Sequence, residues 1–211
     1  MTIEQLAEQL DQETAVTPFV RSGGSFLLLA GLPGSGKSSI VAHLQHHFAT
    51  VTISTDEVRT RLQQNNRYTA VAMEQVYAVC YALIERRLQA GQRVVFDATN
   101  YLAARRQHVI RLAQRMGAAV AIAMVQAAQE TIRQRLQQRT KQQSATDLSD
   151  ADWSVYKWMV EVQEPIAEPH LILDTTTSLP ESLAVQLTHY WLQVEDRAPG
   201  NFNLQSYRRT N

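Results

Sequence analysis

The strongest constraint on the fold is a glycine-rich segment, GLPGSGKS at residues 31–38, which directly follows the apolar run Phe26–Ala30. A short apolar run ending at a glycine predicts a strand buried on both faces, as strands of a parallel sheet are. Apolar periodicity then predicts a helix over Ile40–Phe48, and the helix is expected to start near Lys37. Glycines allow successive backbone N–H groups to converge, and the helix adds the positive end of its dipole. This order of strand, turn and helix predicts an anion-binding loop.

The segment also fits the pattern G-x-x-x-x-G-K-[ST], which is typical of nucleoside triphosphate binding. Lys37 is expected to reach the β and γ phosphates, and the Ser38 hydroxyl to ligate Mg²⁺. No guanine-reading signature stands out, so ATP with Mg²⁺ is the expected cofactor pair. The residues expected to surround the phosphates are Gly31, Pro33, Gly34, Ser35, Gly36, Lys37, Ser38 and Ser39.

The rest of the chain alternates short β-branched or apolar runs with helical periodicity, which predicts an α/β fold with a parallel sheet. Further strands are expected at residues 51–53, 93–96, 118–125 and 171–173, and helices at residues 3–11, 73–90, 103–116, 129–141 and 180–194. Another helix is expected with a cap near Ser149 or Asp150 and with one face formed by Trp153, Tyr156, Met159 and Val160. The predicted division is an N-terminal helical extension (1–24), one domain (25–195) and a polar, mobile tail (196–211).

Composition excludes several classes of protein. Lys plus Arg and Asp plus Glu number 20 each, so no global field draws the chain to nucleic acid or membrane. No apolar run approaches the ~18 residues of a membrane span, and the N-terminus lacks a signal-like pattern. The single cysteine, Cys80, excludes an intramolecular disulfide and is expected to be buried. A cytoplasmic location is expected, and no obligate protein partner is evident.

A second candidate site follows the strand at 51–53. Asp56 and Arg59 lie three residues apart at a helix start, so both side chains project from one face. Asp56 could accept the proton of an attacking hydroxyl while Arg59 binds an anion on the acceptor. The alternative is an acidic first turn with an ordinary i,i+3 ion pair.

Two further groups could complete a phosphoryl-transfer site. Asp97 ends the strand at 93–96, a position from which a carboxylate can support Mg²⁺, although a strand-ending Asp is often only a turn former. Arg135 and Arg139 lie four residues apart on a helix and could close over the triphosphate to neutralise charge, with Arg135 also contacting the nucleotide. The alternative for this pair is a solvated basic face.

With these residues in place, the sequence resembles P-loop kinases of the polynucleotide kinase-like, AAA_33 type, which are related to zeta toxins. The resemblance covers about Phe26–Val194 and rests on the loop, Asp56 with Arg59, the DATN segment at 97–100, the pair Arg135 and Arg139, and SDADW…EP at 149–165. It implies a three-layer α/β/α fold with a five-stranded parallel sheet and a mobile arginine-bearing lid. It also implies that Asp56 is the general base and that Arg59 contacts the acceptor.

The leading hypothesis is therefore an ATP-dependent kinase acting on a hydroxyl acceptor, either a nucleic-acid 5′ end or a nucleoside-like small molecule. Eight basic residues within 101–141, with the aromatic residues Tyr101, Trp153 and Trp158, favour a nucleic-acid acceptor. The same aromatic residues could instead be core residues. The alternatives are a nucleotide-dependent switch with no phosphorylated acceptor and a kinase of sugar nucleotides.

Overall fold

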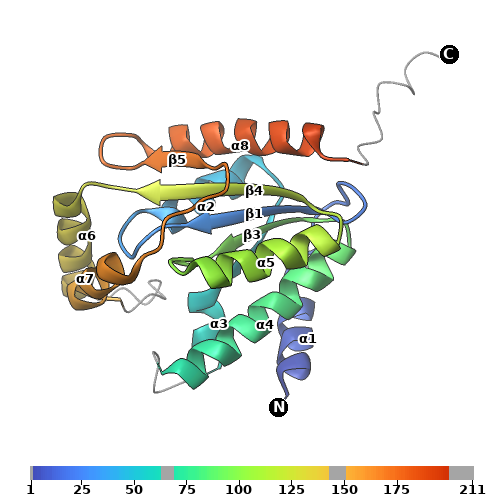
Figure 1. The fold of residues 1–211 in the computed structure, drawn as a ribbon, viewed down its shortest axis with the longest axis horizontal. Helices are drawn as coiled ribbons and strands as arrows, with labels where there is room; N and C mark the ends of the chain where they lie inside the picture. The colour runs from blue at the N-terminus through green and yellow to red at the C-terminus, as the bar shows by residue number, and fades with distance from the viewer. Residues whose placement is uncertain (1, 63–68, 143–150, 200–211) are drawn as a thin grey trace.

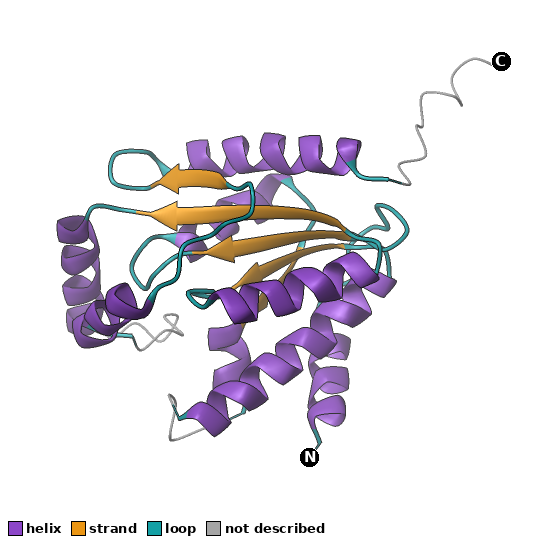
Figure 2. Cartoon of the chain, in the orientation of Figure 1, coloured by secondary structure: helices purple, strands orange, loops and turns teal. Residues whose placement is uncertain are grey.

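The fold is a five-stranded parallel sheet between two layers of helices (Figures 1 and 2). A computed structural model of the 211-residue chain describes residues 2–62, 69–142 and 151–199. Its strands are β1 (Ser25–Ala30), β2 (Val51–Ser54), β3 (Arg93–Asp97), β4 (Ala119–Gln126) and β5 (Leu171–Asp174). Its helices are α1 (Ile3–Glu13), α2 (Lys37–His47), α3 (Thr55–Arg61), α4 (Ala70–Gln89), α5 (Ala103–Arg115), α6 (Gln129–Gln142), α7 (Trp153–Val162) and α8 (Pro180–Arg197).

The strand order is β2-β3-β1-β4-β5, with every neighbouring pair parallel. This confirms the α/β class and the five-stranded sheet expected from the sequence. Parallel strands end at the same edge of a sheet, and β1 lies in the centre of this one. Its last residues are therefore close to the ends of β3 and β4. The register places Leu29 opposite Asp97, and Asp97 in turn opposite Ser54.

Each face of the sheet has its own apolar core. Phe26, Leu28 and Phe96 face α1, α3, α4 and α5, whereas Leu27 and Leu29 face α2 and α8. All five side chains are fully buried, as the alternation along a strand covered on both sides requires. Figure 1 shows α6 and α7 at the end of the sheet to which the strand arrows point.

The N-terminal helix α1 packs into the same core as α4, through Leu6, Ala7 and Leu10. The Arg87 guanidinium on α4 forms an ion pair with Asp11, with 2.7 Å between Nε and Oδ1. The predicted division of the chain after residues 24 and 195 stays a prediction. None of the helices in the described ranges is long and apolar enough to cross a membrane.

Three details differ from the sequence expectations. Helix α4 begins at Ala70, because the Thr69 side chain caps it, and not at Met73. Helix α7 is capped by Asp152, whose carboxylate accepts hydrogen bonds from the N–H groups of Ser154 and Val155. The expected cap residues, 149 and 150, lie outside the described residues, as do residues 200–211 of the tail. Val160, expected on one face with Tyr156 and Met159, is 49% exposed, whereas those two residues are buried.

Candidate active site

The glycine loop between β1 and α2 adopts backbone conformations that side chains disfavour. The φ angles of Gly34 and Gly36 are 77° and 97°, in the left-handed region. A Cβ atom on Gly36 would lie 3.2 Å from Cγ2 of Thr175. The loop thus uses two glycines to bring its backbone against the end of β5 and to start α2 at Lys37.

The start of the loop is held by the segment that follows β3. The Thr99 carbonyl accepts a hydrogen bond from the Gly31 N–H at 3.1 Å, and the buried Asn100 side chain donates to the Leu29 carbonyl at 2.8 Å. Asn100 adopts a φ of 48°, unusual for a residue other than glycine. These bonds couple the loop to the strand that carries Asp97.

Lys37, Ser38 and Asp97 form the polar centre of the site. Ser38 Oγ donates to Asp97 Oδ2 at 3.1 Å, and Lys37 Nζ donates to the carbonyls of Gly31 and Leu32 at 2.7 and 3.3 Å. Burial lowers the pKa of Lys37 and raises the pKa of Asp97, and the attraction between the two opposite charges counteracts both shifts. The site thus contains charges withdrawn from water, which an ionic ligand would compensate.

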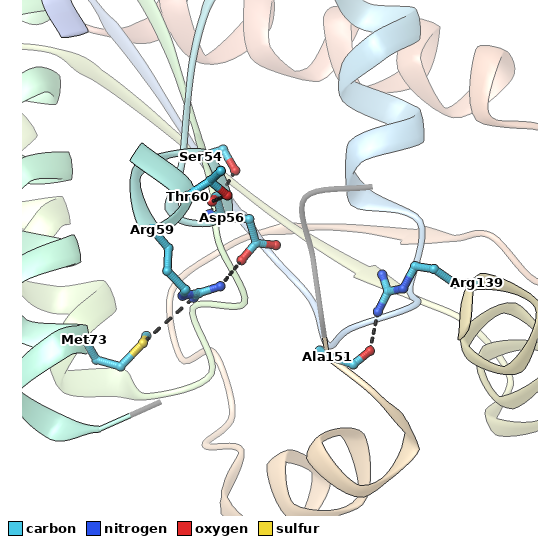
Figure 3. A network of polar contacts seen from close by, with 7 residues as sticks. All are labelled: Ser54, Asp56, Arg59, Thr60, Met73, Arg139 and Ala151. Atoms are coloured by element: carbon cyan, nitrogen blue, oxygen red, sulfur yellow. Dashed lines mark hydrogen bonds and ion pairs between the residues drawn. The ribbon is translucent and has the colours of Figure 1, made fainter. Parts of the chain in front are cut away.

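Asp56 and Arg59 lie on α3, immediately after β2. Arg59 Nη1 is 2.5 Å from Asp56 Oδ1, so the i,i+3 ion pair that was the alternative interpretation of these two residues is present (Figure 3). The Arg59 side chain is almost fully buried and also contacts the Met73 sulfur at 3.8 Å, whereas the Asp56 side chain is 32% exposed. Asp56 also acts on the pKa values of Lys37 and Asp97. The pair therefore belongs electrostatically to the site around the glycine loop.

Arg135, on α6, binds the far side of the loop. Its guanidinium donates to the Gly34 carbonyl at 3.2 Å, and to the Thr175 hydroxyl and carbonyl at 2.8 Å each. The Thr175 hydroxyl in turn donates to the Ser35 carbonyl at 2.7 Å. Thr175 is 4% exposed and was not among the residues predicted from sequence. Arg135 is thus attached to the loop itself.

Arg139 lies one turn further along α6 and donates to the Ala151 carbonyl, just before α7 (Figure 3). Its charge contributes to lowering the pKa of Lys37, which lines the same cleft. A small apolar cluster of Leu32, Ile132, Leu136, Tyr156 and Met159 holds α6 and α7 against the loop. The two arginines expected to act together have different neighbours, but both face the same cleft.

A cleft of about 960 Å³ connects these groups. Of the predicted residues, Gly31 and Ser35 do not line it: Ser35 is 1% exposed and contributes to the loop through its backbone. The cleft is also lined by residues that were not predicted to belong to the site, among them Met73 and Tyr77 of α4 and Arg105 of α5. The predicted residues on its walls are Pro33, Gly34, Gly36, Lys37, Ser38, Ser39, Asp56, Arg59, Asp97, Arg135 and Arg139.

A glycine loop followed by Lys37 and Ser38 at the centre of this parallel sheet, beside a strand-ending Asp97, defines a P-loop protein of the kinase-like type. The AAA_33 family model, described as an AAA domain, matches residues 26–166, and the chain belongs to this family. The finer resemblance to polynucleotide kinases stays a prediction. No curated protein matches the sequence.

Solved structures with the same fold cover most of the chain. Kti12 from Chaetomium thermophilum in complex with ADP-AlF3 has a TM-score of 0.64 at 18% identity, covering 83% of this chain and 100% of its own. The APS kinase CysC from Mycobacterium tuberculosis in complex with AMPPNP and APS has a TM-score of 0.61 at 16% identity, covering 85% and 99%. A gluconokinase from Sinorhizobium meliloti has a TM-score of 0.56 at 18% identity, covering 85% and 95%.

Proposed function

We propose that this protein is an ATP-dependent kinase that transfers the γ-phosphoryl group to a hydroxyl of an acceptor. The observation that carries this proposal is the position of Asp56 and Arg59 in the same cleft as Lys37 and Asp97. A nucleotide-dependent switch needs a group that positions water, whereas a partly exposed carboxylate held by a buried guanidinium suits an acceptor hydroxyl. The acceptor we propose is a polynucleotide 5′-hydroxyl or a nucleoside-like compound.

In the proposed reaction, the oxygen of the acceptor hydroxyl attacks the γ-phosphorus. The Asp56 carboxylate takes the proton of that hydroxyl. The bond between the γ-phosphorus and the oxygen bridging to the β-phosphate breaks, and ADP leaves with that electron pair. Lys37 exchanges its two carbonyl partners for phosphate oxygens. Arg139 lines the same cleft as Lys37 and would add a second positive charge where negative charge develops.

The Ser38 hydroxyl and the Asp97 carboxylate fit Mg²⁺. They are adjacent oxygen donors, and Mg²⁺ in nucleotide sites commonly takes one or two protein oxygens, with phosphates and water completing its coordination. Within the described ranges, no group of three or more His, Cys, Asp or Glu side chains could hold a metal ion, so a site shared with the nucleotide is the arrangement we propose. Bound there, Mg²⁺ would neutralise phosphate charge.

The solved structures support nucleotide chemistry in this fold. Their names include an APS kinase with AMPPNP and APS and a gluconokinase, so the fold accommodates phosphoryl transfer to different hydroxyl compounds. The nucleotide expected for this chain is ATP. Kti12 with ADP-AlF3 shows that a protein not named as a kinase shares the fold, and the test must therefore distinguish transfer from hydrolysis.

The test is transfer of labelled γ-phosphate from ATP to 5′-hydroxyl oligonucleotides, nucleosides and sugar derivatives, with Lys37→Ala as the inactive control. Asp56→Asn keeps an oxygen acceptor for Arg59 but removes the base. We expect kcat to fall about 10²- to 10⁴-fold while ATP affinity stays close to that of the wild type. The thermal unfolding midpoint should fall only by a few degrees, because the buried Arg59 loses a charged partner but keeps an oxygen acceptor. Label released only as inorganic phosphate, whichever acceptor is added, would favour the switch and refute the kinase.

A further inference from the structure

The cleft that contains Asp56 and Arg59 is also lined by aromatic side chains from three separate elements, which we call the aromatic wall. Tyr77 comes from α4, Tyr101 from the segment after β3, and Trp158 from α7, and all three line the cleft. The rings of Tyr101 and Trp158 meet edge to face, with 5.7 Å between centroids and an interplanar angle of 68°. At this separation nothing fits between the two rings, so a planar ligand has to stack on an outer face.

Trp158 has such a face available. It is 49% exposed, which is unusual for a tryptophan that lines a cleft next to buried charges. Trp153, on the same helix, behaves differently: it stacks on Tyr156 at 4.9 Å with an interplanar angle of 17° and does not line the cleft. Helix α7 thus places one tryptophan in packing and the other in the cleft.

A positive charge lies on the same wall. The Arg105 guanidinium, on the first turn of α5, lies 3.8 Å from the centroid of the Tyr77 ring. Its carboxylate neighbour is Glu74 at 3.6 Å, a side chain that is 78% exposed, so this ion pair is largely screened by water. Arg105, whose side chain is 22% exposed, can therefore still pair with an anionic ligand in the cleft, and the Tyr77 ring holds its guanidinium in place.

The cationic side chains of the cleft have different neighbours. Lys37, Arg135 and Arg139 surround the glycine loop, and Arg59 is paired with Asp56. Arg105 instead packs on Tyr77 of the aromatic wall, and binding of a triphosphate at the glycine loop does not require it. An arginine held against one aromatic ring, in a cleft that also has the half-exposed ring of Trp158 on its wall, is a combination with which proteins bind the phosphate and the base of a nucleotide.

Resting on the kinase activity proposed above, we propose that the acceptor is a nucleotide, that is, a compound with a base, an anionic phosphate or phosphodiester, and a free hydroxyl. The base stacks on Trp158 beside Tyr101, the phosphate pairs with Arg105, and the hydroxyl lies at Asp56. A neutral polyol has neither an anion for Arg105 nor a π face for Trp158. Trp158 and Arg105 are therefore the residues that determine acceptor specificity.

The test compares acceptors that lack one recognition element at a time. Cytidine 3′-phosphate and cytidine 5′-phosphate offer opposite hydroxyls, cytidine lacks the anion, and an abasic ribose phosphate lacks the base. In Trp158→Leu we expect KM for the preferred cytidine phosphate to rise about tenfold and KM for the abasic compound to change less than about twofold. In Arg105→Gln we expect the same rise for the nucleotide and no change for cytidine.

Two controls separate these effects from a general loss of structure. Arg111 is an exposed arginine that lies on α5, like Arg105, but does not line the cleft. Arg111→Gln should therefore alter KM neither for the cytidine phosphate nor for cytidine. KM for ATP should be unchanged in all three variants. Equal KM values for the nucleotide in wild type, Trp158→Leu and Arg105→Gln would overturn the assignment, as would a neutral polyol that outperforms every nucleotide.

Binding measured by tryptophan fluorescence distinguishes failure of this assignment from failure of the proposed function. Quenching by a cytidine phosphate that is lost in Trp158→Leu, without any transfer of label, supports the acceptor site and refutes the kinase. Label on polyols without such quenching supports the kinase and refutes the site. If KM for a 5′-hydroxyl oligonucleotide is about a hundredfold lower than KM for the mononucleotide, the acceptor is the end of a nucleic-acid strand. Similar KM values for the two compounds identify a free nucleotide as the acceptor.

Discussion

The Thr175 hydroxyl forms hydrogen bonds with both Arg135 and the Ser35 carbonyl of the glycine loop. Replacing this hydroxyl tests how the loop is supported. Thr175→Val keeps the size and branching of the side chain but removes the donor to the Ser35 carbonyl and the acceptor for Arg135. A neutral hydrogen bond contributes about 0.5–1.5 kcal/mol and one to a charged group about 1.5–3 kcal/mol. Because Arg135 keeps its bonds to the carbonyls of Thr175 and Gly34, the lower part of the second range applies.

We therefore expect Thr175→Val to lower the free energy of unfolding by about 2–3 kcal/mol. For a chain of this length the corresponding fall in the thermal midpoint is roughly 5–10 °C. ATP binding should also weaken, since the variant leaves both the loop and Arg135 less restrained. Urea unfolding and calorimetric titration with ATP measure the two effects.

Thr175→Ser is the matched control, because it keeps the hydroxyl and removes only the methyl group. Its free energy of unfolding should fall by about 1 kcal/mol, and its ATP affinity should remain close to that of the wild type. If the valine and serine variants unfold at the same urea concentration and bind ATP equally well, the hydroxyl does not support the loop and the reasoning is refuted.

Three further predictions concern the loop, the core and the thiol. Gly36 has a φ of 97° and a crowded Cβ position, so Gly36→Ala should weaken ATP binding at least tenfold in a calorimetric titration. Gly117 has a φ of 79° but open space around its Cβ position, so Gly117→Ala should only lower the free energy of unfolding by about 1–2 kcal/mol. The buried Arg106 guanidinium donates to three backbone carbonyls, so Arg106→Met should lower the free energy of unfolding in urea by at least about 3 kcal/mol. Arg111 is exposed, and Arg111→Met should change that free energy by less than about 0.5 kcal/mol. Burial raises the pKa of the Cys80 thiol, so iodoacetamide at about pH 8.5 should label the protein only in denaturant, and equal labelling of the folded protein would contradict this.

The positions that could be predicted from sequence are those whose local pattern and place in the sheet agree. The glycine loop has a spacing tied to one chemistry, and Asp97 and Asp56 follow strands whose ends a parallel sheet brings together. Cys80 is buried as expected. The ion pair of Asp56 and Arg59, which was the alternative interpretation of the two residues, needs only local information, since the side chains are three positions apart on a helix.

What could not be predicted depends on contacts between distant segments. Thr175 lies in a run of three threonines typical of a loop, and only the end of β5 beside β4 brings it to Ser35. Arg106 was counted with the basic surface that favours nucleic acid, yet it is 2% exposed and binds backbone carbonyls. A strand-end position within a parallel sheet was the available signal for Thr175. Arg106 offered no such signal, because its neighbour Arg105 has the same residue type and yet lines the cleft.

The Arg106 guanidinium also joins the backbone on both sides of the aromatic wall. It donates to the carbonyls of Asn100 and Tyr101 and to that of Pro165, and the Tyr101 carbonyl accepts from the Glu164 N–H as well. The chain path that carries Tyr101 and the end of α7 is thus set from within the protein, independently of the rings that project into the cleft. If the proposed acceptor site is correct, the side chains at 105 and 158, which lie outside the apolar cluster that holds α6 and α7 at the loop, are the positions at which substitutions should change acceptor choice with the least effect on the glycine loop.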